Sequence, residues 1–301
     1  MTVSTGPWRA AGARPEFPRS PWSAGDSDSA PDAEATDPAG SSEVEPPARV
    51  VVGANPDAPI DLRNPDPWSV EPAPRPLEGR VAVVTGGGDP VGRAVAMALL
   101  DAGARVCVMG RDATTLRATT AAAGAHAPIL YLQCDLGSVA EVEGAADFIS
   151  RFDRPVDVLV HSAQVHVPHT LAAGPVNDLD EQYLVNVRGP YLLTQKLLPQ
   201  LVAGPGQVVF LVEEPQGEAD VQYKMTAAAV GGLAAGLRAE VEPTGVRVAT
   251  VRASRQGGAA PGAADPADSA EIAVAVVTAV GLPSAVDVRE VSVRPTVDLT
   301  F

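Results

Sequence analysis

From Arg80 onward, short apolar runs alternate with amphipathic stretches of helix length. This alternation is typical of repeated strand-helix-strand units, in which helical crossovers join parallel strands. The apolar runs are nearly unbroken, as expected for strands that helices cover on both faces. Because such crossovers are right-handed, the pattern predicts an α/β fold with a doubly wound parallel sheet of seven strands. The strands are expected at residues 81–84, 106–109, 129–133, 156–160, 207–212, 246–251 and 288–293, and the helices near 91–102, 112–123, 138–151, 178–202, 220–242 and 269–280.

The first 76 residues differ in composition from the rest of the chain. They are rich in Pro, Ser, Ala and acidic residues, so they bury too little apolar surface to offset the entropy of ordering. We therefore expect a long irregular extension at 1–76, followed by one α/β domain at 77–301. All three tryptophans, Trp8, Trp22 and Trp68, fall in the extension, each directly after a proline. Tryptophan is common in binding hot spots, so this pattern predicts either a protein partner for the extension or packing on its own subunit.

Charge and apolar content argue against two classes of partner. The net charge is -15, and Lys and Arg form no basic patch of the kind that nucleic-acid binding requires. There is no run of about 18 apolar residues and no apolar stretch of signal-peptide length at the start, so we expect no membrane association and a cytoplasmic location. Cys107 and Cys134 fall in predicted buried strands and are interpreted as core residues rather than a disulfide or metal pair.

A glycine-rich segment follows the first predicted strand. It reads Thr-Gly-Gly-Gly-Asp-Pro-Val-Gly at residues 85–92 and leads into a predicted helix. Glycines at such a turn let the backbone approach a dinucleotide pyrophosphate, and the helix N-terminus supplies N–H groups and a positive dipole end. The segment resembles the Thr-Gly-x-x-x-Gly-x-Gly motif of the short-chain dehydrogenase/reductase family, whose Rossmann fold agrees with the strand pattern. One position differs, because Pro90 replaces the middle glycine and lacks a backbone N–H.

The resemblance continues through the next strands and implies a cofactor. Arg111 follows the second predicted strand, where a basic residue in this family pairs with the 2′-phosphate of NADP(H). Asp135, after the third strand, matches the family's aspartate near the adenine. The fourth strand leads into His-Ser-Ala-Gln at residues 161–164, in place of the family's Asn-Asn-Ala-Gly. The resemblance therefore implies NADP(H) as the cofactor, if any cofactor binds in spite of Pro90 and Ala227. The residues that it implies as contacts are Gly86, Gly88, Val91, Gly92, Arg111, Asp135 and Ala163.

The catalytic residues that the resemblance implies are only partly present. Asn186 corresponds to the family's helix-borne asparagine, and Tyr223 to the tyrosine of its Tyr-x-x-x-Lys helix. The lysine position holds Ala227, so the cation that would lower the pKa of the phenol is missing there. Lys224 is a poor substitute, because adjacent helix residues point about 100 degrees apart. Glu213 stands in the place of the catalytic serine, where an ionised carboxylate would oppose negative charge on a carbonyl oxygen.

These departures leave three functions open. The first is a family member without reductase activity that acts as a binding or structural subunit. As in the family's dimers, it would form a homodimer or tetramer, or a heteromer with an intact sibling, through the helices at 178–202 and 220–242. The second is an enzyme for non-redox chemistry, such as cyclisation, isomerisation or dehydration, with Glu213 or Tyr223 as acid or base. The alternative for Glu213 is a solvated carboxylate at the rim of the cleft, without a role in catalysis. The third is an atypical NADP-dependent carbonyl reductase.

Overall fold

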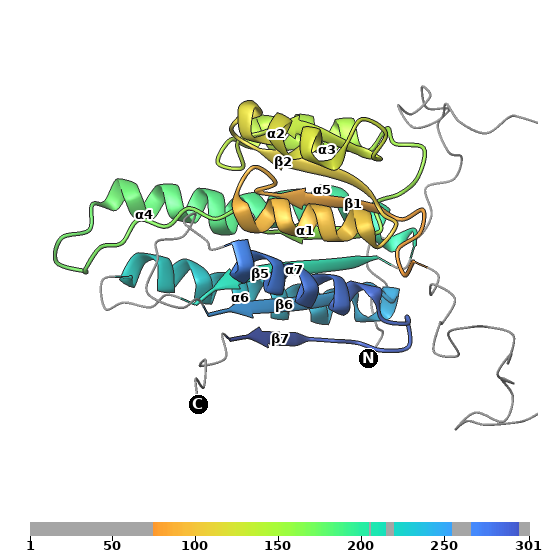
Figure 1. Cartoon of the computed structure of the whole chain (residues 1–301). Coiled ribbons are helices and arrows are strands. Elements are labelled where there is room, and N and C mark those ends of the chain that lie inside the picture. Colours follow the sequence, from red (N-terminus) through yellow and green to blue (C-terminus); the bar gives the residue numbers. More distant parts are fainter. Residues whose placement is uncertain (1–74, 205, 215–219, 255–265, 295–301) are drawn as a thin grey trace, which may run out of the picture. The chain divides into compact units, whose positions relative to one another are not determined.

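The computed structural model describes residues 75–204, 206–214, 220–254 and 266–294. Apart from its last two residues, the predicted extension lies outside the described residues, and Trp8, Trp22 and Trp68 lie there with it. The predicted boundary between residues 76 and 77 therefore stays a prediction. The described residues form the α/β domain that the sequence leads one to expect (Figure 1).

Seven strands in this part of the chain form one parallel sheet, which confirms the predicted fold. Their order is β3-β2-β1-β4-β5-β6-β7, so the chain starts inside the sheet and winds first to one edge and then to the other. The winding reverses between β1 and β4, whose carboxyl ends border the crevice where such sheets usually bind ligands. The strands are β1 (Val81–Thr85), β2 (Arg105–Gly110), β3 (Ile129–Gln133), β4 (Val158–His161), β5 (Gln207–Glu213), β6 (Arg247–Ala253) and β7 (Glu290–Val293).

Helices cover both faces of the sheet (Figure 1). Val84 and Val108 belong to one buried core, whereas Val83 and Cys107 belong to the other. Neighbouring side chains of the inner strands thus serve two cores, which explains why these strands are mostly apolar. The edge strand β7 differs, because it reads Glu-Val-Ser-Val and its alternate side chains are exposed. The first core is completed by α1 (Pro90–Asp101), α2 (Ala113–Ala123) and α7 (Pro266–Gly281), and the second by α3 (Val139–Ile149), α5 (Gly189–Val202) and α6 (Val221–Val241).

The helix predicted at 178–202 is divided in the structure. α4 (Val176–Tyr183) passes into a π-helical turn at Leu184–Arg188, and α5 begins after it. Pro190 gives a reason for the break, because it has no N–H to donate to the carbonyl of Asn186, four residues earlier. A wider π-helical turn relieves such a conflict and is frequent at functional sites. Asn186 lies in this turn and lines a small cavity beside the carboxyl end of β4.

The two cysteines behave as the sequence predicts. Cys107 and Cys134 are both free and buried, so they form no disulfide. Burial raises the pKa of both thiols to about 12, which keeps them protonated and unreactive at neutral pH. As for membranes, none of the helices in the described ranges is long and apolar enough to span one.

Candidate functional site

The glycine-rich segment at residues 85–92 forms the turn between β1 and α1. Gly86 has a φ of +71°, a conformation that other residues rarely adopt. A Cβ on Gly92 would overlap the carbonyl of Gly86, and one on Gly88 would overlap the hydroxyl of Thr115. Packing of the turn therefore requires these glycines, and their presence does not by itself establish that a ligand binds there.

Pro90 is the first residue of α1, where the missing N–H removes no bond from the helix. The fold thus accommodates this departure from the family's motif. Asp89 precedes Pro90, and its side chain makes no capping hydrogen bond to the helix. Burial raises the pKa of the Asp89 carboxyl, while the nearby guanidinium of Arg111 acts in the opposite direction. A partly buried acid and a helix N-terminus therefore meet where the family binds a pyrophosphate.

A cavity of ≈ 180 Å³ lies beside this turn. Arg111 on its border also pairs with Glu181 of α4, with 3.2 Å between Nη1 and Oε1. Val91 and Gly92, which were predicted to contact a cofactor, are instead buried residues of α1 and do not line this cavity. The structure brings the other predicted contacts together along its border, namely Gly86, Gly88, Arg111, Asp135 and Ala163.

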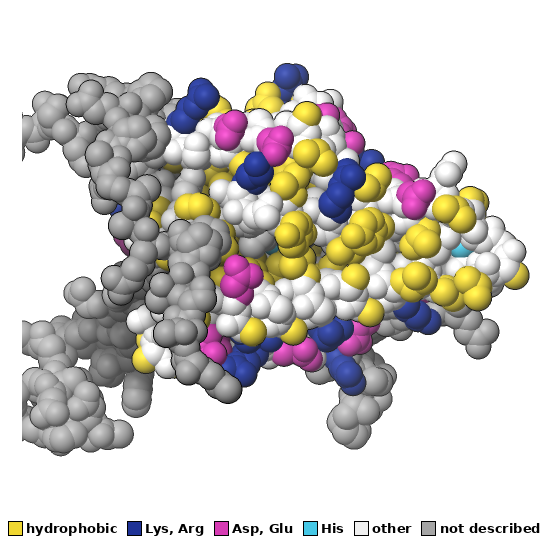
Figure 2. All heavy atoms as spheres, turned by 180° about the vertical axis from the view of Figure 1, so that it is seen from behind, with side chains coloured by type: hydrophobic (Ala, Val, Ile, Leu, Met, Phe, Trp, Pro, Cys, Tyr) yellow, Lys and Arg dark blue, Asp and Glu magenta, His cyan; other side chains and the backbone are white. Residues whose placement is uncertain are grey.

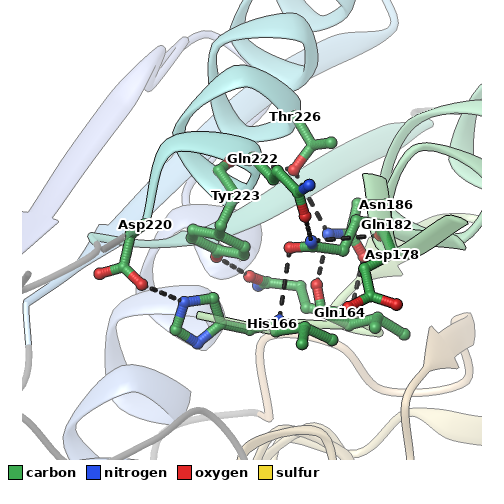
Figure 3. A network of polar contacts seen from close by, with 11 residues as sticks. Gln164, His166, Asp178, Gln182, Asn186, Asp220, Gln222, Tyr223 and Thr226 are labelled. Carbon is green, nitrogen blue, oxygen red and sulfur yellow. Dashed lines mark hydrogen bonds and ion pairs between the residues drawn. The ribbon is translucent and has the colours of Figure 1, made fainter. Parts of the chain in front are cut away.

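Gln164 lines this cavity and also contacts Tyr223 (Figure 3). The family has a glycine at its position. Its Nε2 donates a hydrogen bond to the carbonyl of Leu211 at 2.9 Å, and its Oε1 accepts one from the hydroxyl of Tyr223. The space that remains on the tyrosine side is ≈ 20 Å³, about enough for one water molecule. This cavity, which described residues line, is too small for a carbonyl substrate.

The amide of Asn186 is engaged by the loop that follows β4. Its Oδ1 accepts a hydrogen bond from the backbone N–H of Val165, and its Nδ2 donates one to the carbonyl of the same residue, both at 2.7 Å. Nδ2 also lies 3.4 Å from the hydroxyl of Thr226 on α6. These bonds hold the loop and α6 together, so structure alone accounts for an asparagine at this position. Asn186 and Tyr223 nevertheless line the same small cavity.

The two departures at the catalytic positions are both set in packed surroundings. Ala227, at the position of the family's lysine, packs against the second core, and Lys224 is exposed on α6. Glu213 ends β5 opposite Ala253 of β6, and 9% of its surface is exposed. The alternative of a solvated rim carboxylate is therefore wrong. Tyr223, by comparison, is 2% exposed.

A buried hydrogen-bonded pair of His166 and Asp220 beside Tyr223 was not predicted from the sequence. Nε2 of His166 lies 2.6 Å from Oδ1 of Asp220, and each side chain is 8% exposed. The His166 ring meets the Tyr223 ring edge to face, with 4.7 Å between their centroids (Figure 3). The pair joins the loop after β4 to the start of α6. Its members are 54 residues apart and belong to none of the motifs above, so no sequence signal links them.

Comparison with known proteins agrees with the fold. The family model for short chain dehydrogenase matches residues 80–255. An uncharacterised oxidoreductase of Staphylococcus aureus is 27% identical over 228 residues, which cover 73% of this chain and 98% of the relative.

Solved structures lead to the same family. A metagenomic short-chain oxidoreductase in complex with NADP is 28% identical, has a TM-score of 0.65, and matches over 74% of this chain and 100% of that chain. An alcohol dehydrogenase from the archaeon Thermococcus sibiricus, complexed with 5-hydroxy-NADP, shares the fold with a TM-score of 0.65 at 23% identity, over 73% of this chain and 100% of that chain. Since the family model spans more than half of the sequence, this protein belongs to the short chain dehydrogenase family.

Proposed function

We propose that this protein is a family member without hydride-transfer activity that acts as a binding or structural subunit. The observation that carries the proposal is the side chain of Gln164, which accepts a hydrogen bond from the Tyr223 hydroxyl (Figure 3) and donates one to the carbonyl of Leu211. The nicotinamide cofactor that the family implies fits these residues only in part. A cavity of ≈ 180 Å³ is present on the side of Arg111, whereas the cavity that described residues line beside Tyr223 has ≈ 20 Å³.

The residues around Tyr223 support this proposal. Ala227 brings no positive charge that would stabilise a tyrosinate. An ionised Glu213 accepts hydrogen bonds but donates none to a substrate carbonyl, and its charge disfavours a developing oxyanion. Both departures oppose the same step, the protonation of a carbonyl oxygen.

The subunit part of the proposal concerns the face formed by α5 and α6. Figure 2 views the molecule from the side opposite to Figure 1, and hydrophobic side chains gather across the middle of that face. A groove of ≈ 370 Å³ is lined by residues of both helices, among them Tyr191, Leu198 and Leu233. A Cβ on Gly232 or Gly236 would meet nothing within 4 Å. Packing within the subunit does not explain these two glycines, whereas close approach by a second copy of the chain does.

Activity measurements test the first part. The purified protein is mixed with NADPH or NADH and a panel of aldehydes and ketones, with a family reductase of intact motifs as the positive control. We expect no oxidation of the cofactor above the rate of a Tyr223→Phe variant, which keeps the ring and lacks the hydroxyl. Turnover by the natural chain that Tyr223→Phe loses would contradict the proposal and favour the atypical reductase.

Light scattering tests the second part. The protein is expected to be a dimer or a larger oligomer at micromolar concentration. Gly236→Gln, which places a side chain at the groove, is expected to weaken association by about tenfold or more. Gly144→Gln on α3 is the matched control, because a Cβ there also meets nothing within 4 Å. A monomeric natural chain, or equal effects of the two substitutions, would contradict this assignment of the face.

One observation favours the second candidate function, acid–base chemistry without hydride transfer. The buried His166–Asp220 pair contacts Tyr223, and an imidazole oriented by a carboxylate is a common general base. The pair borders neither of the two cavities beside Gln164, which makes this the weaker candidate. Incubation with a metabolite mixture, followed by mass spectrometry, would favour it if a product formed with the natural chain but not with a folded His166→Gln variant.

A further inference from the structure

His161 brings a buried polar atom to the small cavity beside Tyr223. The residue ends β4, is 3% exposed, and lines this cavity of ≈ 20 Å³. Nε2 of its ring lies 2.8 Å from the hydroxyl of Thr194, which does not line the cavity. Nδ1 is buried and makes no hydrogen bond to any of the described residues. Of the two ring nitrogens, Nδ1 is therefore the one that can meet an occupant of the cavity.

An unpaired Nδ1 would be unfavourable. A buried nitrogen that loses its hydrogen bonds to water costs free energy, and the large majority of buried polar side-chain atoms have a partner from the protein or from ordered water. The ring cannot turn without giving up the contact of Nε2 with Thr194 and the stacking on Phe210, where the ring centroids are 5.0 Å apart. The partner must therefore come to the nitrogen, inside the cavity.

The size and charge of the cavity suit one water molecule. A water molecule needs about 10–15 Å³ of such space, so a cavity of ≈ 20 Å³ holds one. Burial lowers the pKa of His161 to about 3, so the imidazole is neutral at neutral pH, and none of the described residues that line the cavity carries a charge to hold an ion. Water also suits either neutral tautomer, because it donates to a bare nitrogen and accepts from an N–H group.

Two further side chains of the lining can bind the same molecule. Oε1 of Gln164 accepts a hydrogen bond from Tyr223, and an amide oxygen has a second acceptor position (Figure 3). The hydroxyl of Thr226 donates to the carbonyl of Tyr223 at 2.9 Å, which leaves its oxygen able to accept a bond. Together with His161, these side chains offer the two to four polar partners that a buried water molecule needs.

We propose that this cavity binds a single water molecule, held between Nδ1 of His161 and Oε1 of Gln164. The water ties Gln164 to the end of β4 and stabilises its contact with Tyr223. A carbonyl substrate would have to displace both the water and Gln164, and displacing a well-ordered water without replacing its hydrogen bonds lowers affinity. The inference goes beyond the proposed function, because the ligand-free protein would hold this water whether or not it transfers hydride to a bound substrate.

A high-resolution crystal structure of the full natural chain tests the proposal directly, since an ordered water molecule is visible there. We expect one water within about 2.7–3.2 Å of both Nδ1 of His161 and Oε1 of Gln164. His161→Phe keeps an aromatic ring and removes the nitrogen, so the water is expected to be lost. Thr194→Val removes the partner of Nε2 and leaves Nδ1 in place, so this matched control is expected to keep the water.

Two results would overturn the proposal. A natural chain without density for a water at this position would mean that Nδ1 stays unpaired, and this result does not depend on whether any variant folds. A water that persists in His161→Phe would mean that the other side chains hold it without the histidine. Neither result decides the proposed function, which fails instead if the natural chain turns over carbonyl substrates.

Discussion

A fall in pH from 7.5 to 5.5 is expected to destabilise this protein through one buried imidazole. His161 ends β4, is 3% exposed, and stacks on Phe210 with 5.0 Å between ring centroids. Its Nε2 lies 2.8 Å from the hydroxyl of Thr194. Burial lowers the pKa of His161 to about 3, because the imidazolium would lose its hydration without gaining a charged partner. The ring is therefore neutral in the folded protein across the usual pH range.

The sign of the effect follows from the two states. In the unfolded chain the imidazole titrates near 6.5, so below that pH unfolding takes up one proton. The stability contributed by neutral His161 is fully present above about pH 6.5 and is lost as the pH falls toward the folded-state pKa of about 3. Between pH 7.5 and 5.5 this linkage amounts to about 1.4 kcal/mol, the value of one proton over one full pH unit.

Urea denaturation followed by circular dichroism at the two pH values measures this term. The sequence pI is ≈ 4.6, so at pH 5.5 the protein keeps a net negative charge that helps to hold it in solution. Between pH 7.5 and 5.5, the free energy of unfolding of His161→Asn is expected to fall by about 1.4 kcal/mol less than that of the natural chain, whatever the absolute stability of the variant. His126→Asn changes an exposed histidine and is expected to match the natural chain. Equal pH dependence of His161→Asn and the natural chain would refute the reasoning.

Three further outcomes are expected from single substitutions. Glu181→Gln releases Arg111 and is expected to raise the affinity for 2′-AMP by up to about fivefold in a calorimetric titration, with 5′-AMP unchanged as the control. Asp157→Ala removes the carboxylate that accepts a hydrogen bond from the buried N–H of Val81 at 2.9 Å, so chemical denaturation is expected to show a free energy of unfolding lower by about 1–3 kcal/mol. A decrease below about 0.5 kcal/mol would contradict this role. Tyr223→Phe removes the hydroxyl that donates to Oε1 of Gln164, and it is expected to lower the free energy of unfolding by about 1 kcal/mol without changing the oligomeric state. Dissociation of the oligomer would mean that the hydroxyl also acts outside the crevice.

The fold was predictable because its signals are local and repeated. The six strands from β1 to β6 are short, mostly apolar runs, and the crossovers between them contain stretches with the length and periodicity of helices. The π-helical turn at Leu184–Arg188 was not predicted, because the apolar pattern of 178–202 continues through it. Pro190 was the available signal, since a proline inside a helix removes the hydrogen bond to the residue four positions earlier.

The site was predictable only as far as its motifs reach. The resemblance to the family implied that Arg111 and Asp135 belong to a cofactor site. In the structure both line the larger cavity, because the ends of parallel strands meet at one edge of the sheet. Gln164 was noticed as a departure from a glycine, yet its consequence depends on where a long side chain ends, which spacing does not reveal. The pairing of His166 with Asp220 depends on a contact between a loop and a helix 54 residues apart. Such tertiary contacts leave no local pattern in a single sequence.

The account depends on an unequal crevice, in which the described residues leave ≈ 180 Å³ on the Arg111 side of Gln164 and ≈ 20 Å³ on the tyrosine side. Saturation-transfer NMR of the natural chain with excess NAD⁺ tests this directly, because the adenine and nicotinamide protons are resolved in one spectrum. We expect saturation to reach the adenine protons and not the nicotinamide protons. Equal saturation of both rings would show that the nicotinamide enters the space beside Tyr223, and the central claim would be wrong.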